Sequence, residues 1–464
     1  MRFISVLAAL LISACAYQPK PQLPSALTYI QRNSNDKVLH IDISEKETRS
    51  LADLIDIQEI TPWLTRLTQR SFDLKISELQ RLQQALAIQQ SESHRLPELS
   101  AVSSAERTKS HLQQTPYQTQ YQLGAQVSWE LDLWNKIALQ SDSAALDYTK
   151  SLIQQSSLRR SIAAQAIKHL LTYSAFQSQI NDEERVVSIL GQLKDKSKKQ
   201  WASGLTSSAA FEVANERYLE AAFSLEQNQQ KHNEVRLQLR QLAQMEKHEE
   251  LPALRSMVAL PNATVTGKYL LQRPDIHQAF IDIKKVDING KMAYRSLYPS
   301  FSLNLDIRQT AIGEQNLLGS DPLWQLLGQL TMPVFQGGRL RRDIDIAEYE
   351  SRKALVAYKK NFQDAYFEVR RLMVRETSLT KMRLIQIARI ESNQKLADTS
   401  LREYQVGMSD YSYLAGHQIN LIQQQKALTL LKLEQSLNRI DLFLALGLPL
   451  YNSASPDKKQ LGEF

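Results

Sequence analysis

Three segments of the chain alternate between apolar and polar residues over nine to thirteen positions. Residues 121–133 carry apolar side chains at the odd positions, and 300–308 and 324–334 each keep one apolar face. Residues 99–105 show the pattern more weakly. Period-two alternation of this length predicts strands whose two faces meet different solvents. A soluble sandwich is the alternative, but ordinary strands are shorter, about 5–6 residues.

The apolar side of these strands is a candidate surface for contact with lipid. Four strands cannot close a barrel, because small barrels need about eight. An open sheet edge in a bilayer leaves unpaired N–H and C=O groups, each costing several kcal/mol. The pattern therefore predicts an oligomer. The lipid-facing candidates are Val127, Trp129, Leu131, Phe301, Leu303, Leu305, Leu330 and Met332.

Long helical patterns follow the strands. Lys136–Gln200 contains no proline and one glycine, and Arg339–Gln405 contains neither. At 1.5 Å per residue each would extend roughly 100 Å, so each needs neighbours along its length and is expected to pack as a coiled coil. Returning helices are expected at Phe211–Gln244 and Tyr411–Leu446.

The two turns between these helices carry recognisable signals. Gly204 and Gly407 suit the left-handed residue that ends a helix. The next helix would be capped by Ser207 or Ser208 in the first case and by Ser409 or Asp410 in the second.

The whole pattern occurs twice, about two hundred residues apart, which indicates a duplicated unit rather than a short solenoid period. The matching segments are Ser71–Leu74 with Arg273–Ile276, Leu96–Pro97 with Tyr298–Pro299, Leu133–Trp134 with Val334–Phe335, Trp201–Gly204 with Tyr404–Gly407, and Asn233 with Asn438.

Composition narrows the class of protein. Of 464 residues only 14 are glycine and 14 proline, which favours long helices with few turns. The net charge is +7, but Lys and Arg are interspersed with Asp and Glu, as on a solvated helix surface. We therefore expect no nucleic-acid partner.

The N-terminus has the features of a bacterial export signal. An apolar stretch at 3–12 follows Met1-Arg2 and is too short to span a bilayer. Ile12-Ser13-Ala14-Cys15 resembles a lipobox, and Cys15 is the single cysteine in the sequence. We expect acylation of Cys15 and anchoring in the outer membrane; an ordinary signal peptide that contains a cysteine is the alternative.

Catalytic motifs are absent from the sequence. There is no HExxH, no P-loop and no GxSxG elbow. We expect neither an enzyme nor a cofactor or metal site.

Several longer motifs resemble the TolC-type outer membrane factors, in particular the lipoprotein branch that serves RND-type multidrug efflux pumps. The echoes are Gln272–Ile276, Tyr298–Ser300, Val127–Leu133, Pro333–Leu340 and Tyr404–Gly407 with Asp410, Tyr411 and Leu414. The resemblance covers roughly residues 50–448. It implies a mainly helical chain with membrane strands, and a homotrimer forming a twelve-stranded barrel and a periplasmic helical tunnel.

The resemblance also implies roles for the two turns. Gly204, Leu205, Gly407 and Met408 would contact a periplasmic adaptor, although a simple helix stop explains the glycines equally well. The gate candidates, near the second turn, are Asp410, Ser412, Tyr413 and Gly416. Gly416 occupies a position that is commonly acidic in the family, so the usual carboxylate ring is in doubt.

The expected domain organisation follows the duplication. The segments are a signal peptide at 1–14, an N-terminal equatorial segment at 15–60, a first repeat at 61–248 with strands near 98–106 and 121–134, an equatorial linker at 249–265, a second repeat at 266–448 with strands near 300–308 and 323–335, and a tail at 449–464.

The function implied is a passive outer membrane conduit for small molecules in a tripartite efflux system. Its expected partners are the periplasmic adaptor, an inner membrane RND or similar transporter, and outer membrane lipid. Two alternatives stay open: a type I protein secretion channel, and a lipid-anchored periplasmic coiled-coil adaptor or structural protein.

Overall fold

The computed structural model describes residues 60–109, 117–245, 251–252, 270–312 and 321–448. The expected signal peptide, Cys15, nearly all of the 15–60 segment, most of the 249–265 linker and the C-terminal tail lie outside these residues. The chain divides into two compact units. Of the described residues, those within 82–150 and 278–360 form one unit, and those within 60–81, 151–277 and 361–448 form the other. Helices α4, α5, α8 and α9 contribute residues to both.

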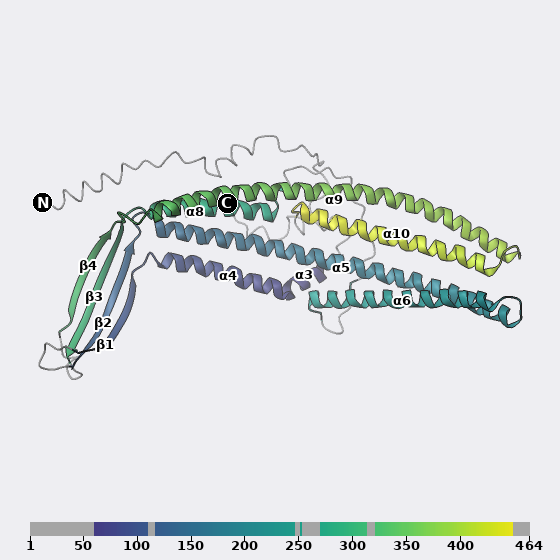
Figure 1. Ribbon diagram of the computed structural model, residues 1–464, viewed down its shortest axis with the longest axis horizontal. Helices are drawn as coiled ribbons and strands as arrows, with labels where there is room; N and C mark the ends of the chain where they lie inside the picture. The colour runs from purple at the N-terminus through teal and green to yellow at the C-terminus, as the bar shows by residue number, and fades with distance from the viewer. Residues whose placement is uncertain (1–59, 110–116, 246–250, 253–269, 313–320, 449–464) are drawn as a thin grey trace, which may run out of the picture. The chain divides into compact units, whose positions relative to one another are not determined.

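The first unit contains one antiparallel sheet in the order β1-β2-β3-β4 (Figure 1). Its strands are β1 (Glu98–Lys109), β2 (Tyr117–Leu131), β3 (Ser300–Ile312) and β4 (Leu323–Thr331). The register pairs Val127 with Leu99 on one side and with Leu305 on the other. The four expected strands are therefore neighbours in a single sheet, with β1 and β4 at its edges.

The strand ends differ from the alternation pattern in two ways. Away from the helices, β1 and β3 extend past 106 and 308, and β2 begins before 121. The alternation breaks down there, with Tyr117, Ala311 and Ile312 among polar residues, although the ladder continues. At the other end, β2 stops at Leu131 because the Asp132 carboxylate accepts the backbone N–H groups of Ile137 at 3.1 Å and Ala138 at 2.8 Å, which starts α5. Strand β4 stops before Pro333, which has no N–H for the ladder.

Four helices adjoin the sheet, and two of them, α5 and α8, are joined by ion pairs within the same unit. The four helices are α4 (Phe72–Ser93), α5 (Lys136–Ala202), α8 (Pro274–Arg295) and α9 (Arg339–Gln405). Between α5 and α8, Lys285 Nζ lies 2.7 Å from the Asp147 carboxylate and Lys150 Nζ 2.6 Å from that of Asp282. The earlier residue of α5 pairs with the later residue of α8 and the later with the earlier, so the two helices run antiparallel.

The second unit is helical and contains α3 (Thr61–Arg70), α6 (Ser208–Ala243) and α10 (Tyr411–Ala445) together with the larger parts of α5 and α9. Helix α3 lies against α6. A core where α5, α6 and α10 meet includes Leu190, Ala214 and Ile422, each at most 7% exposed. Cross-helix ion pairs fix the α5–α10 register: Lys168 pairs with Asp441, and Lys426 Nζ lies 2.5 Å from Glu183.

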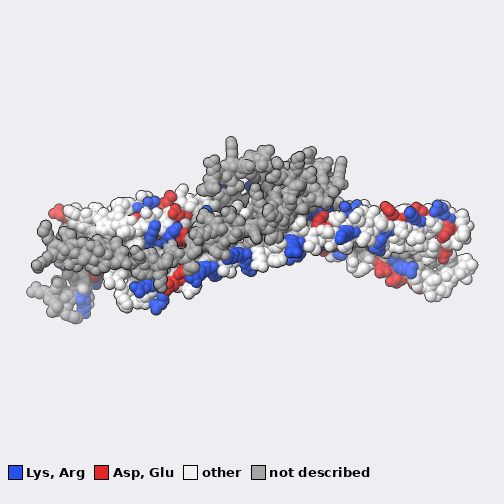
Figure 2. All heavy atoms as spheres, turned by 90° about the horizontal axis from the view of Figure 1, so that it is seen from above, with Lys and Arg blue, Asp and Glu red and all other residues white. Residues whose placement is uncertain are grey.

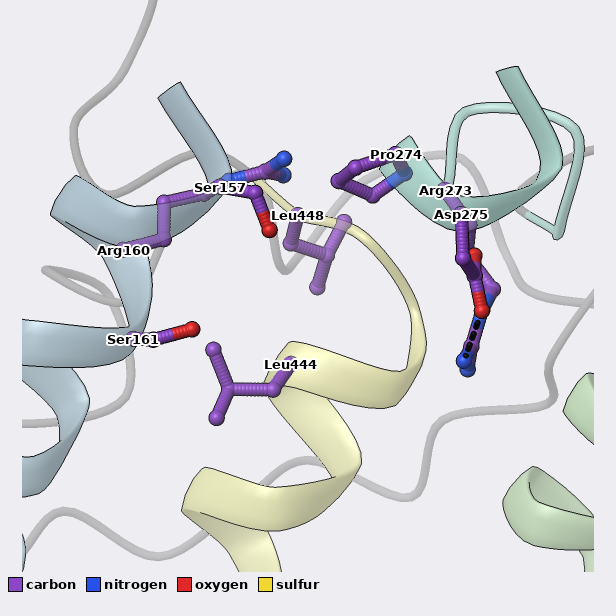
Figure 3. Close-up of a pocket in the computed structure, with 8 residues that line it drawn as sticks. All are labelled: Ser157, Arg160, Ser161, Arg273, Pro274, Asp275, Leu444 and Leu448. Carbon is purple, nitrogen blue, oxygen red and sulfur yellow. Dashed lines mark hydrogen bonds and ion pairs between the residues drawn. The ribbon is translucent and has the colours of Figure 1, made fainter. Parts of the chain in front are cut away.

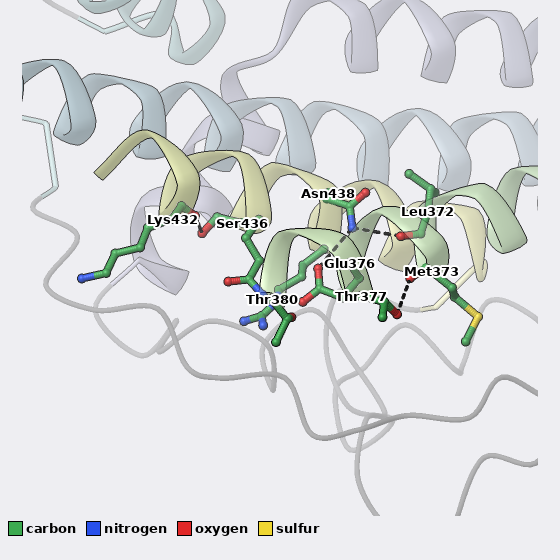
Figure 4. A network of polar contacts seen from close by, with 10 residues as sticks. Leu372, Met373, Glu376, Thr377, Thr380, Lys432, Ser436 and Asn438 are labelled. Carbon is green, nitrogen blue, oxygen red and sulfur yellow. Dashed lines mark hydrogen bonds and ion pairs between the residues drawn. The ribbon is translucent and has the colours of Figure 1, made fainter. Parts of the chain in front are cut away.

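A polar network joins α9 to α10 inside this unit (Figure 4). The Glu376 carboxylate accepts hydrogen bonds from Arg439 Nε at 2.8 Å, Gln435 Nε2 at 2.8 Å and Asn438 Nδ2 at 3.1 Å. The Arg439 and Glu376 side chains are only 12% and 19% exposed. Such a buried pair costs desolvation but is well supplied with hydrogen bonds, so its role is to fix the pairing of the two helices.

The duplication is visible in helix lengths. Helices α5 and α9 both have 67 residues, and α4 and α8 both have 22. The pairing of Asn233 with Asn438 departs slightly from the helix starts: α6 and α10 begin at Ser208 and Tyr411, an offset of 203 that aligns Asn233 with Ser436, two residues before Asn438. Asn233 is exposed, whereas Asn438 is buried.

The charged residues are distributed as the sequence indicates. On the face seen in Figure 2, Lys and Arg alternate with Asp and Glu without a block of one sign. Among the described residues, none of the helices has a stretch both apolar enough and long enough to cross a lipid bilayer.

Candidate functional site

One face of the sheet is apolar across all four strands. Directly paired residues point to the same face of a sheet. Leu131 pairs with Phe301, and Phe301 with Leu330; Trp129 pairs with Leu303. Together with the Val127–Leu305 pair, these contacts put seven of the eight lipid-facing candidates on one face. The eighth, Met332, lies one residue beyond the end of β4.

The height of this apolar face matches a bilayer. From Leu131 to Tyr121 the chain advances ten residues, about 33 Å at roughly 3.3 Å per residue. A strand tilted by about 40° would then cover about 25 Å of membrane, the height of the apolar band in outer membrane barrels.

Aromatic residues lie at both ends of this face. At the end nearer the helices, Trp129 Nε1 donates to the Arg95 carbonyl at 2.9 Å and Trp134 Nε1 to the Pro299 carbonyl at 2.6 Å. At the other end, Tyr117 is 53% exposed, and Trp324, near the end of β4, is 73% exposed. Rings with satisfied N–H groups suit a position between the apolar layer and water.

The opposite face of the sheet is mostly hydrophilic, with Val102, Ile312, Leu323 and Leu327 as its apolar side chains. Gly124 lies opposite Arg308, and a Cβ at Gly124 would come within 2.6 Å of the Ile307 carbonyl oxygen, so β2 and β3 approach closely there. Arg308 Nε lies 3.6 Å from the Asp306 carboxylate. A sheet with one apolar and one hydrophilic face can separate lipid from a water-filled path. The polar side chains on this face are Glu98, Ser100, Ser104, Glu106, Thr108, Gln118, Gln120, Gln122, Gln126, Ser128, Glu130, Ser300, Ser302, Asn304, Asp306, Arg308, Thr310, Gln325, Gln329 and Thr331.

The two helix turns of the second unit have the same backbone design. Gly204 and Gly407 are left-handed, with φ of 73° and 76°. In each turn the following residue closes the helix, with Leu205 N–H bonded to the Gln200 carbonyl and Met408 N–H to that of Glu403, both at 2.8 Å. This is the Schellman ending expected of a glycine at this position.

Each turn is followed at once by a capped helix. The Ser207 hydroxyl accepts the Ala210 N–H at 3.3 Å, and the Asp410 carboxylate accepts that of Tyr413 at 2.8 Å. Of the two cap residues expected at each turn, the structure therefore selects Ser207 and Asp410.

The turns expose large apolar side chains. Leu205 is 79% exposed, Met408 80% and Val406 70%. Exposed apolar residues at the ends of two hairpins are typical of a surface that contacts another protein. The adaptor-contact candidates Gly204, Leu205, Gly407 and Met408 all lie on these turns.

Aromatic residues and a lysine surround the second turn. Lys196 Nζ lies 2.8 Å from the Tyr404 hydroxyl and 4.5 Å from the centre of the Tyr411 ring. The Tyr411 hydroxyl donates to Gln192 Oε1 at 2.7 Å. Burial raises the pKa of Tyr411, partly offset by the nearby Lys196 charge. Sequence reasoning missed this contact, because Lys196 belongs to the other repeat.

The gate candidates lie at the start of α10. Asp410 is engaged as a cap, Ser412 is exposed, and the Tyr413 ring packs edge-on against His417 with centroids 4.6 Å apart. Gly416 has no side-chain or loop atom within 4 Å of where its Cβ would lie. The structure brings Asp410 and Tyr413 into contact, while a gating role for any of the four stays a prediction.

A small cavity lies where α5, the start of α8 and the end of α10 meet (Figure 3). Its volume is about 180 Å³. Arg160 Nη1 donates to the Gly447 carbonyl at 2.9 Å, and burial lowers the pKa of Arg160. The lining residues are Ser157, Arg160, Ser161, Arg273, Pro274, Asp275, Leu444 and Leu448.

Arg273 at the edge of this cavity shows what the Arg273–Ile276 motif does at the start of the second repeat. Its guanidinium holds Asp275 through contacts of 3.0 and 2.8 Å and Glu368 at 2.9 Å, and it donates to the Ala445 carbonyl at 2.6 Å. Burial alone would lower the pKa of Arg273, but the Asp275 and Glu368 contacts raise it overall. Burial would raise the pKa of Asp275, but the Arg273 contacts lower it. The motif therefore ties α8 to α9 and α10.

The two-faced sheet and the paired 67-residue helices closing at glycine turns are the fold that solved outer membrane channels share. Residues 265–448 match the family model described as "Outer membrane efflux protein". This match, together with the relatives below, confirms the resemblance to TolC-like outer membrane factors that the motifs indicated.

The curated relatives are distant but extend over most of the chain. The solvent efflux pump outer membrane protein SrpC of Pseudomonas putida is 24% identical over 76% of this chain and 77% of its own length. The cation efflux system protein CusC of Escherichia coli K12 is 22% identical over 81% and 83%. The probable outer membrane lipoprotein SilC of Salmonella typhimurium is 20% identical over 96% and 98%.

Solved structures share the fold. The CmeC outer membrane channel of Campylobacter jejuni superposes with a TM-score of 0.79 at 16% identity, covering 95% of this chain and 97% of its own. A CusC structure gives 0.77 at 19% identity, covering 93% and 99%. The mainly helical fold with a small antiparallel sheet is thus confirmed.

Proposed function

We propose that this protein is the outer membrane channel of a tripartite efflux system and that three copies build the pore. The observation that carries the proposal is the four-stranded sheet with one apolar face about as tall as a bilayer and one hydrophilic face. Its edges, β1 and β4, have no partner strand within the described chain. In a membrane those edges need neighbouring copies, since unpaired backbone groups are costly in lipid.

Three copies would pair β1 of one chain with β4 of the next and close a twelve-stranded barrel. The hydrophilic faces would then line the lumen, and the apolar faces, including Val127, Leu303 and Leu305, would meet lipid. The number three rests on the resemblance to the family, whereas the need for several copies rests on the open edges. The long helices of the three chains would together enclose the periplasmic tunnel.

The partners follow from the helix turns and the N-terminus. We place a periplasmic adaptor at the turns holding Gly204, Leu205, Gly407 and Met408, with an inner membrane RND or similar transporter beyond it. An acyl group on Cys15, after removal of residues 1–14, would hold the chain to the outer membrane. Asp410, Ser412, Tyr413 and Gly416 would form the closing ring, with a weaker carboxylate field than usual in the family.

The substrates would be small molecules selected by the pump rather than by this chain. Relatives of similar distance are named for cations in one case and for solvents in another. A conduit of one architecture can serve both, because the hydrophilic face of the sheet carries many uncharged amides and hydroxyls rather than a dedicated binding site.

The test is drug, metal and solvent susceptibility of a deletion strain. Wild type should restore resistance to at least one compound class, while Leu205→Glu combined with Met408→Glu should not, because charges would replace the apolar contact surface. Membrane level and the heat-sensitive oligomer band should be equal for both. Unchanged susceptibility after deletion, with loss of a secreted protein instead, would support the type I secretion alternative and contradict the efflux role.

A further inference from the structure

The apolar face of β1 changes character at its far end. The residues of this strand on that face are Leu99, Ala101, Ser103, Ala105, Arg107 and Lys109. The first four are apolar or small, and the last two are cations. All twelve residues of β1 are exposed within the single chain.

The register gives the height of these two cations. Arg107 pairs with Thr119 and Lys109 with Tyr117, two and four residues beyond Tyr121, where the apolar face ends. At about 3.3 Å per residue and a tilt of about 40°, they lie roughly 5 and 10 Å above the apolar band. The head-group layer of a bilayer is about 5–8 Å thick on each side, so Arg107 lies within it and the Lys109 backbone just beyond it, within reach of the long lysine side chain.

The two charges are held together without a counterion from the described chain. The Tyr117 ring centre lies 5.0 Å from Arg107 Cζ and 5.5 Å from Lys109 Nζ. The intervening Glu106 belongs to the other face, where it pairs with Gln120 and accepts from the Thr108 hydroxyl at 3.4 Å. Among the described residues, no acidic side chain lies within ion-pair distance of either cation. Aromatic support lets two like charges lie close to each other, ready for a shared anion.

We propose that Arg107 and Lys109, supported by Tyr117, bind the phosphate groups of lipid head groups in the membrane leaflet around the far end of the sheet. This rests on the proposed barrel, because it needs the apolar face to meet lipid. The acyl chains that cover the apolar residues place a head group directly beside the two cations. A guanidinium matches a phosphate with two parallel hydrogen bonds, and the ammonium adds a point charge.

The experiment compares lipid binding to the full chain purified in neutral detergent. Native mass spectrometry would measure the binding of phosphatidic acid and of phosphatidylcholine with the same acyl chains. Wild type should prefer phosphatidic acid. Arg107→Gln with Lys109→Gln should weaken phosphatidic acid binding about fivefold per cation removed. High salt should also weaken the binding of phosphatidic acid to wild type, because it screens the two charges.

Two variants make the result specific. Arg308→Gln removes a cation from the opposite face of the same sheet and should leave the lipid preference unchanged. Arg107→Lys with Lys109→Arg keeps both charges and should retain most of the binding, which also reports on folding. Equal binding by wild type and the double glutamine variant, or an equal loss with Arg308→Gln, would overturn the site. Failure of wild type to enter lipid vesicles would instead contradict the proposed barrel.

Discussion

At the residue scale, the chain just after α10 requires a glycine, because Gly447 lies too close to the Arg273 backbone for a side chain. The φ of Gly447 is +67°, and an added Cβ would lie 3.0 Å from Arg273 Cα and 3.1 Å from its nitrogen. Gly447→Ala should therefore lower stability by about 2–3 kcal/mol, combining left-handed strain with a backbone clash. The measurement is thermal unfolding followed by circular dichroism.

Two other glycines supply matched controls for that change. Gly204 has φ of +73° with open space around it, so Gly204→Ala should cost only the left-handed strain, about 1–2 kcal/mol. Gly416 lies within α10 with open space, so Gly416→Ala should stabilise by about 0.5–1 kcal/mol. An equal loss for Gly447→Ala and Gly204→Ala would show that the Arg273 contact is irrelevant.

The Arg273–Asp275 contact should also make stability depend on pH. The pKa of Asp275 is lowered in the folded chain, chiefly because the Arg273 contacts outweigh its burial. The contact therefore adds stability at pH values above the unfolded pKa, about 3.9, and that contribution is lost as pH falls through the lower folded pKa. The unfolding temperature of wild type should drop more steeply below about pH 4 than that of Arg273→Gln. Parallel curves for the two proteins would refute the coupling.

At the scale of elements, the α9–α10 pairing depends on the buried Glu376 carboxylate. Glu376→Ala removes the acceptor for Arg439, Gln435 and Asn438 and should cost about 3 kcal/mol. Glu434→Ala is the control, since its partner Arg375 is 3.8 Å away and both side chains are more than half exposed. That change should stay within about 0.5 kcal/mol. Similar unfolding temperatures for the two variants would mean that the network contributes little.

The elements themselves were largely predictable, and their contacts were not. The stretch without glycine or proline predicted the observed bounds of α9, Arg339–Gln405. Helix α5 ends two residues past the expected Gln200. Strand ends near the hairpin loops were missed because apolar and polar residues do not alternate there. The Glu376–Arg439 pair joins residues 63 positions apart, so it depends on how two helices align in space. No local pattern encodes that alignment.

The candidate sites also include features that the local sequence predicts and contacts that only the fold reveals. The turn glycines and caps follow from local backbone rules, so their structure could be predicted from the sequence. The cation pair at Arg107 and Lys109 could have been found because odd-numbered residues of β1 share one face. It lies, however, past the residues where apolar and polar side chains alternate regularly. The Lys196 contact to Tyr404 links the two repeats across 208 positions and required the fold.

At the scale of the whole molecule, the proposed pore needs the two faces of the sheet to meet different solvents. Leu305 lies in the central row of the apolar face, paired with Val127 and Leu326, and Asn304 is its neighbour on the hydrophilic face. An arginine at the middle of a barrel's lipid face costs about 2–4 kcal/mol, whereas a lumen position tolerates it. Leu305→Arg should therefore reduce the heat-sensitive oligomer in membranes and abolish complementation, and Asn304→Arg should preserve both. The variants differ by one position and add the same charge, so a difference between them reflects which face of the sheet carries the arginine. If both variants assembled equally, or if only Asn304→Arg failed, the sheet would not stand between lipid and water as proposed.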